Sequence, residues 1–348
     1  MVGKTSLFTI LTGVHEATRV GTMEARVGVT KVPDARLDAL AKIFQPEKIT
    51  HATVEYLDFQ AVSKEALRDP SYLASMRVAD ALAHVLRLFE SDTVPHEKGS
   101  VDPIRDLEDV ETELILSDLG VVEKRLERLE KDRKKIKSPE LDREYALLER
   151  AKATLESNTA LRTLDLTADE EKTIRGFQFL SQKPMLFVLN IGEEDAARMH
   201  EIEEQYRTGP LAARTRTAVT AICGKIEAEL AELSPEEARE YLASYGLKES
   251  GLERLIAATY SLLGLMSFLT AGETEVRAWT IPMHSTAVKA AGAIHSDFEK
   301  KFIRAETVNW QALVDHGGYP GVREKGLLRL EGKEYIVKDG DVLVIRHG

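Results

Sequence analysis

The chain has 348 residues, of which 43% are hydrophobic and 30% charged, and its formal net charge at pH 7 is −11. This length is enough for two or three domains with buried cores. The negative charge argues against broad, nonspecific binding of nucleic acid, so we expect no DNA partner and RNA contact only through local patches. The single cysteine, Cys223, excludes an internal disulfide, and the lack of a membrane-length apolar run favours a cytoplasmic protein.

The first residues contain half of a phosphate-binding loop. Gly3, Lys4 and Thr5 match the end of the pattern G-x-x-x-x-G-K-[ST], whose backbone N–H groups bind the phosphates of a nucleotide. In that pattern the Lys4 ammonium contacts the terminal phosphates and the Thr5 hydroxyl holds Mg²⁺. The first glycine and the strand before it would precede residue 1. We therefore expect either a true start upstream or a degenerate paralogue, and the surviving site residues favour the first.

Two stretches, residues 1–107 and 166–263, alternate helical and strand-like patterns as an α/β domain does. A helix is expected to begin within residues 6–11, and another covers 225–233. Strands are expected at 53–58, 81–89, 184–190 and 219–223. Because open α/β sheets bind ligands at the carboxyl ends of parallel strands, polar residues at those ends are candidates for a site.

Between these stretches, residues 108–165 carry a heptad pattern. Apolar side chains follow 4-3-4-3 spacing at Ile115, Leu119, Val122, Leu126, Leu129 and Ile136, and Arg133 takes the one polar seam position. Ser138 and Pro139 then form an N-cap followed by proline, and a second apolar stripe follows at Leu141, Tyr145, Leu148 and Leu155. The pattern predicts an inserted helical hairpin. Residues 121–137 hold eight Lys/Arg against four Asp/Glu, which indicates a solvated face more readily than an RNA contact.

The last segment, residues 264–348, changes to short strands and turns. A strand is expected at 276–281, and residues 334–337 and 342–346 are expected to pair as a hairpin about the K-D-G-D turn.

Nucleotide-switch elements occur in their usual order along the chain. Lys4 and Thr5 are followed by a threonine, Thr22, that could sense the terminal phosphate. Asp58 could stand behind Mg²⁺, and Asn190-Ile191-Gly192-Glu193 ends a strand where a base is read. Because the candidates occur in the order typical of a nucleotide switch, each assignment is better supported than it would be alone.

At this point the chain resembles the YchF/Obg-like ATPases, P-loop proteins of the TRAFAC GTPase class. The resemblance spans essentially the whole chain and is strongest in a few long runs. These are residues 32–40 (VPDARLDAL), 102–116 (DPIRDLEDVETELIL), 124–130 (KRLERLE), 225–233 (KIEAELAEL), 270–281 (TAGETEVRAWTI) and 295–306 (HSDFEKKFIRAE).

The resemblance implies a fold: an α/β P-loop NTPase domain (1–107 and 166–263, first strand missing), an inserted α-helical coiled-coil hairpin (108–165), and a C-terminal α+β β-grasp, ubiquitin-like TGS domain (264–348). It also implies a monomer that binds ATP, with GTP as a second candidate, hydrolyses it slowly with Mg²⁺, and engages the ribosome or ribosomal RNA. The implied nucleotide-binding residues are Gly3, Lys4, Thr5, Ser6, Asn190, Ile191, Glu193, Cys223 and Gly224. The implied metal residues are Thr5, Thr22 and Asp58, and no catalytic residue is assigned.

Two departures from the family pattern bear on hydrolysis. Ala61 replaces the glycine of D-x-x-G, and a β-carbon there would be strained by roughly 1–3 kcal/mol if φ were positive. The glycine-rich switch that follows is replaced by residues 62–71 (VSKEALRDPS). The alternative function is therefore a degenerate, non-hydrolysing adaptor that binds ribosome or RNA through its coiled coil and TGS domain.

Overall fold

The computed structural model describes residues 2–14 and 25–348. The chain divides into two compact units: the first comprises Met1–Gly28 and Tyr56–Ala258, and the second comprises Val29–Glu55 and Thr259–Gly348. A two-stranded sheet of β1 (Arg26–Lys31) and β3 (Thr53–Asp58) carries the chain from the first unit to the second and back. Within the described residues, no helix is both long and apolar enough to cross a membrane.

The first unit is built on a parallel sheet in the order β4-β5-β6. The strands are β4 (Leu82–Arg87), β5 (Met185–Asn190) and β6 (Thr217–Ile222). Every residue of β5 is buried, as expected for a central strand with both faces covered. The three predicted strands are thus confirmed, with ends shifted by one or two residues.

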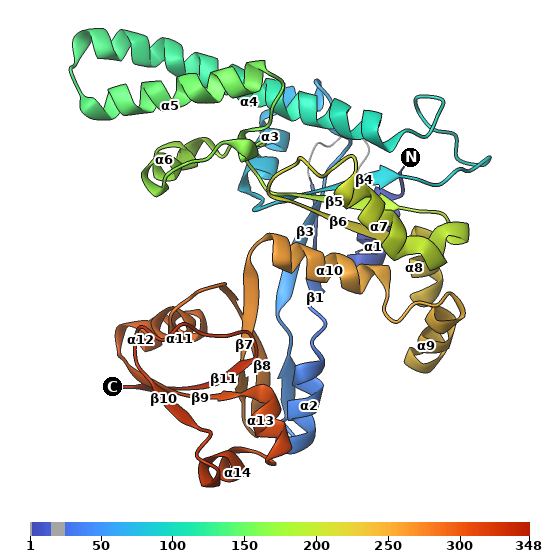
Figure 1. Ribbon diagram of the computed structural model, residues 1–348, viewed down its shortest axis with the longest axis vertical. Coiled ribbons are helices and arrows are strands. Elements are labelled where there is room, and N and C mark those ends of the chain that lie inside the picture. Colours follow the sequence, from blue (N-terminus) through green and yellow to red (C-terminus); the bar gives the residue numbers. More distant parts are fainter. Residues whose placement is uncertain (1, 15–24) are drawn as a thin grey trace. The chain divides into compact units, whose positions relative to one another are not determined.

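The first unit also contains a set of shorter helices (Figure 1). They are α1 (Lys4–Thr12), α3 (Pro70–Val78), α6 (Ala168–Ile174), α7 (Met199–Thr208), α8 (Gly224–Leu230), α9 (Pro235–Ser244) and α10 (Gly251–Leu262), the last of which ends in the second unit. Short 3₁₀ turns lie at Ala66–Arg68, Leu161–Thr163, Arg175–Phe177 and Glu193–Arg198. Helices α1 and α8, which are far apart in the sequence, contact each other.

A long pair of helices, α4 (Pro103–Lys135) and α5 (Pro139–Glu156), forms an arm on the first unit (Figure 1). Asp102 and Ser138 cap the two helices by accepting backbone N–H bonds, and each is followed by proline. Most of the predicted seam is buried, with members such as Val122, Leu129 and Leu148 fully inaccessible and Leu119, Leu141 and Tyr145 half-buried. Arg133 takes its seam position by placing its guanidinium 4.2 Å from the Tyr145 ring centroid.

One seam prediction is wrong. Ile136 is 60% exposed, because α4 ends at Lys135 and the residue falls in the turn between the helices.

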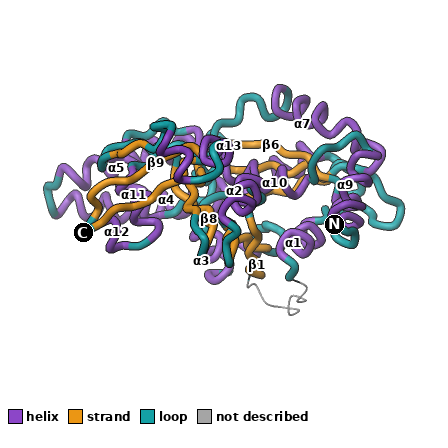
Figure 2. Tube along the Cα trace, turned by 90° about the horizontal axis from the view of Figure 1, so that it is seen from below, coloured by secondary structure: helices purple, strands orange, loops and turns teal. Residues whose placement is uncertain are grey.

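The second unit contains a six-stranded mixed sheet in the order β10-β9-β11-β7-β8-β2. Its strands are β2 (Lys48–Thr50), β7 (Leu265–Ala271), β8 (Glu275–Pro282), β9 (Phe302–Asn309), β10 (Arg329–Glu331) and β11 (Asp341–His347). The helices are α2 (Ala35–Phe44), α11 (Ala287–Ile294), α12 (Ser296–Lys300), α13 (Trp310–Asp315) and α14 (Tyr319–Glu324). Figure 2 shows α11 and α12 beside β9, which both helices contact.

The boundary of this unit differs from the sequence-based one, which placed all of residues 1–107 in the nucleotide-binding domain. Val29–Glu55 groups with the C-terminal segment instead. The reason is packing: β2 extends the sheet in parallel with β8, and the α2 side chains Leu37 and Leu40 are fully buried in the core of the second unit.

The hairpin predicted at 334–337 and 342–346 is also wrong. β11 pairs with β9 and β7, whereas residues 334–337 form only an isolated bridge between Ile336 and Thr286. The turn itself does form, because the Lys338 N–H donates to Asp341 and the Asp341 N–H donates to the Lys338 carbonyl.

Candidate nucleotide-binding site

The phosphate-loop tripeptide lies at the start of a helix. Gly3 is the N-cap of α1 and has φ +83°, a left-handed conformation that favours glycine. A β-carbon there would also lie 2.5 Å from the Asn190 amide nitrogen, so this position has two separate reasons for glycine. Thr5 and Ser6 are exposed in the first turn of α1, where backbone N–H groups have no partner within the helix. Such a turn suits the binding of an anion.

Asp58 ends β3 and gathers two cations. Its Oδ1 lies 3.1 Å from Lys4 Nζ, and its Oδ2 accepts a hydrogen bond from Arg26 Nη2. The Asp58 side chain is 6% exposed, against 34% for Lys4 and 11% for Arg26. The Arg26 guanidinium also lies 4.8 Å from the ring centroid of Phe8, a buried residue of α1. The structure therefore brings Lys4 and Asp58 into contact.

Asn190 joins three segments at the end of β5. Its Nδ2 donates to the Val2 carbonyl at 3.0 Å, and its Oδ1 accepts from the Gly224 N–H at 3.0 Å. Because β5 and β6 run parallel and in register to Ile222, their carboxyl ends bring Asn190 and the start of α8 to the same edge. A polar side chain that is 3% exposed needs such partners, so Asn190 fixes the loop before α1 against the start of α8.

Glu193 follows Asn190 on the exposed side of the site. Its two oxygens accept hydrogen bonds from Lys225 Nζ and the Tyr245 hydroxyl. These bonds, that from Lys225 first, lower the pKa of Glu193 and keep it a carboxylate that accepts hydrogen bonds.

Ile191 and Cys223, by contrast, are 2% and 1% exposed and belong to the hydrophobic core. Burial raises the pKa of the Cys223 thiol, so it behaves as a small core residue. Only the backbone at these two positions is available to a ligand.

Of the three predicted metal residues, the structure describes Thr5 and Asp58. Thr22 lies outside the described residues. Thr5 offers a hydroxyl and Asp58 a carboxylate, and within residues 2–14 and 25–348 no three His, Cys, Asp or Glu side chains cluster as a protein-only metal site would need. This donor set fits Mg²⁺, which is commonly held by one or two protein groups together with substrate phosphates.

The segment after Asp58 is packed instead of loose. Ala61 is not among the described residues with positive φ, so the strain considered for its β-carbon is absent. Leu67, Tyr72 and Met76 are buried in the core, and the Tyr72 hydroxyl donates to the Gln60 carbonyl at 3.0 Å. Residues 62–78 thus form a 3₁₀ turn and α3 held by side-chain contacts, in place of the glycine-rich switch.

Comparisons with known proteins bear on this geometry. The YchF-GTPase C-terminal family model, described as a protein of unknown function (DUF933), matches residues 265–348. "Ribosome-binding ATPase YchF" of Bacillus subtilis (strain 168) is 41% identical over 352 residues, covering 99% of this chain and 96% of the relative. The protein of the same name from Escherichia coli O157:H7 is 41% identical over 351 residues, covering 98% and 95%. The chain belongs to the YchF family.

A solved structure agrees with this assignment. The Schizosaccharomyces pombe YchF GTPase matches with a TM-score of 0.82 and 29% sequence identity, covering 99% of this chain and 94% of that chain. The α/β content expected from the resemblance to YchF proteins agrees with this structure.

Sequence reasoning missed three partners at this YchF site. Arg26 lies in a strand with no motif around it, and its contact with Asp58 spans 32 residues. Tyr245 follows α9 and reaches Glu193 across 52 residues. Lys225 directly follows the predicted Cys223-Gly224 pair, which was the one available signal for it, and it reaches Glu193 across 32 residues.

Proposed function

We propose that this chain binds ATP with Mg²⁺ at the start of α1 and hydrolyses it slowly, with GTP as a second nucleotide that it accepts. The observation that carries the proposal is Lys4 Nζ placed 3.1 Å from the Asp58 carboxylate beside a left-handed Gly3. The relatives' names, a ribosome-binding ATPase and a GTPase, support the same activity.

Each residue has a role that follows from its position. Lys4, the more exposed cation on Asp58, is free to turn toward phosphate, and the N–H groups of the first turn of α1 bind phosphate oxygens. Thr5 and Asp58 would hold Mg²⁺, which when bound neutralises charge on the phosphates. Asn190 and Gly224 shape the base end of the site, where the Glu193 carboxylate accepts N–H bonds from a base. Ile191 and Cys223 contribute backbone only.

Slow turnover follows from the segment after Asp58. A switch must rearrange around the terminal phosphate, yet residues 62–78 are anchored by buried side chains. Releasing Tyr72 and Met76 from the core would cost several kcal/mol, since burying a large apolar side chain contributes about 1.5–3 kcal/mol.

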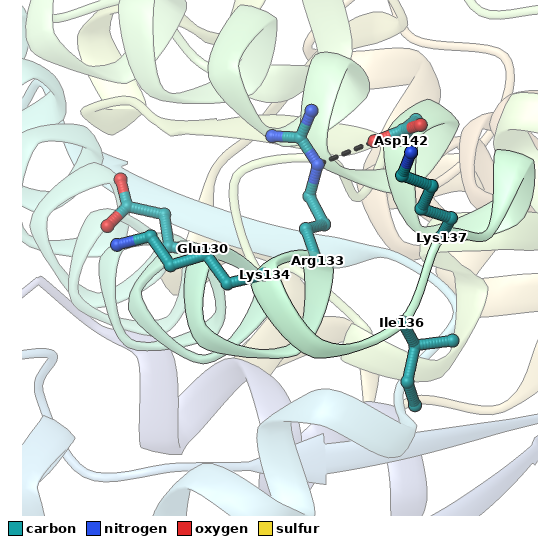
Figure 3. Close-up of a pocket in the computed structure, with 6 residues that line it drawn as sticks. All are labelled: Glu130, Arg133, Lys134, Ile136, Lys137 and Asp142. Atoms are coloured by element: carbon teal, nitrogen blue, oxygen red, sulfur yellow. Dashed lines mark hydrogen bonds and ion pairs between the residues drawn. The ribbon is translucent and has the colours of Figure 1, made fainter.

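We also propose that the α4–α5 arm is the family's coiled-coil insertion and that residues 264–348 are its TGS domain. Figure 3 shows Arg133, Lys134 and Lys137 around a pocket at the tip of the arm, with the exposed Ile136 beside them. Arg133 pairs with Asp142 at 2.6 Å, whereas Lys134 extends away from that pair. Local positive charge on an acidic protein suits phosphate contacts with ribosomal RNA, and a cytoplasmic location follows from such a partner.

The nucleotide part is tested with the full chain by isothermal titration with ATP in Mg²⁺ and by phosphate release. Lys4→Ala should weaken binding by more than about tenfold, because a charge-assisted contact contributes about 1.5–3 kcal/mol. Arg198→Ala, at an exposed ion pair on the same unit, should bind as the wild type does. Equal phosphate release by wild type and Lys4→Ala would instead indicate the non-hydrolysing adaptor.

The ribosome part is tested by cosedimentation with ribosomes at two salt concentrations. The double variant Lys134→Glu, Lys137→Glu should lose association, and a matched double reversal off the arm, Lys172→Glu, Lys248→Glu, should not. Equal loss in both would show that only net charge matters.

A further inference from the structure

Arg26 places a permanent positive charge beside the carboxylate that the proposed function gives to Mg²⁺. Its Nη2 donates to Asp58 Oδ2, the oxygen opposite the one that Lys4 contacts. Among the described residues, two cations therefore contact the Asp58 carboxylate before any ligand arrives.

The two cations differ in how firmly they are held. Arg26 is 11% exposed and lies over the Phe8 ring, so its guanidinium has a face contact as well as an ion pair. Lys4 is three times more exposed and has a flexible stem, which allows it to leave for a phosphate. When it does, Arg26 remains as the charge on Asp58.

We propose that Arg26 is a built-in cation that makes ATP binding by this chain less dependent on Mg²⁺. Two effects act in the same direction. The guanidinium supplies positive potential to the triphosphate when the metal is absent, and it repels a divalent cation and competes with it for the Asp58 carboxylate when the metal is present. This inference rests on the proposed function, because it concerns nucleotide binding at the same site.

The experiment measures the ratio of the ATP dissociation constant in EDTA to that in excess Mg²⁺, by isothermal titration with the full chain. Arg26→Gln removes the charge and keeps a donor, and its ratio should rise about tenfold over that of the wild type. Arg26→Lys keeps the charge and should stay within about threefold of the wild type. Arg198→Gln, an exposed arginine on α7's N-cap that pairs with Glu201, is the matched control and should not change the ratio.

The outcomes separate the two claims. An unchanged or lower ratio in Arg26→Gln, or a rise of the same size in Arg26→Lys, would overturn the inference and leave ATP binding intact. No ATP binding by the wild type in either buffer would overturn the proposed function and the inference with it. Should Arg26→Gln unfold, Arg26→Met provides the test: it keeps a long side chain over the Phe8 ring without the charge and should raise the ratio in a folded protein, and an unchanged ratio would count against the inference.

Discussion

Asn190 should contribute more to the stability of the first unit than a typical polar residue. Asn190→Ala removes the acceptor of the Gly224 N–H and the donor to the Val2 carbonyl in one step. Leaving a buried polar group without its partner costs about 1–3 kcal/mol, so the expected loss is about 2–4 kcal/mol. Asn190→Asp keeps the acceptor of the Gly224 N–H but places a second carboxylate oxygen against the Val2 carbonyl, so it should cost at least as much.

The chain provides its own control for this measurement. Both tryptophans, Trp279 and Trp310, belong to the second unit, so fluorescence follows that unit while far-ultraviolet circular dichroism follows the helices of both. With a urea m-value of about 2–3 kcal/mol/M for a unit of this size, Asn190→Ala should lower the circular dichroism midpoint by about 1 M. An unmoved midpoint, or an equal shift in the tryptophan signal, would refute the assignment of this energy to the first unit.

Three further predictions concern Gly3, Leu148 and His84. Gly3→Ala should abolish tight ATP binding and lower the melting temperature more than Gly13→Ala does. Both glycines have positive φ, but only at Gly3 would the new β-carbon lie against Asn190. Equal shifts in melting temperature would contradict this reasoning. Leu148→Ala in the arm should cost about 2–5 kcal/mol in urea unfolding, whereas Leu116→Ala, at a residue 53% exposed on α4, should stay within about 0.5 kcal/mol. Burial lowers the pKa of His84 from 6.5 to about 4, although Asp106 opposes the shift. As the pH falls from 6.5 toward 4, the unfolded chain therefore takes up a proton at His84 that the folded chain does not. The folded state loses up to about 3 kcal/mol of stability over this range. His84→Phe should flatten that part of the stability curve, and a curve that keeps its slope would place the titrating group elsewhere.

The sequence by itself determined the local elements and the order of the site along the chain. A short continuous apolar run such as residues 185–190 indicates a buried strand, and the heptad spacing with its Ser138-Pro139 break indicates two packed helices. Lys4 and Asp58 were identified because their residue types and order match a nucleotide switch, and the fold brings them into contact.

The tertiary structure alone decided which partners meet across long separations. Nothing near Arg26 in the sequence indicates that it reaches Asp58, and nothing near residues 29–55 indicates that they complete the C-terminal sheet. The hairpin predicted around residue 339 failed for the same reason, since β11 gains more pairing from β9 and β7 than from its neighbour in sequence. Periodicity and capping act over a few residues, whereas strand order, ion pairs and unit boundaries depend on contacts between segments whose local patterns carry no information about each other.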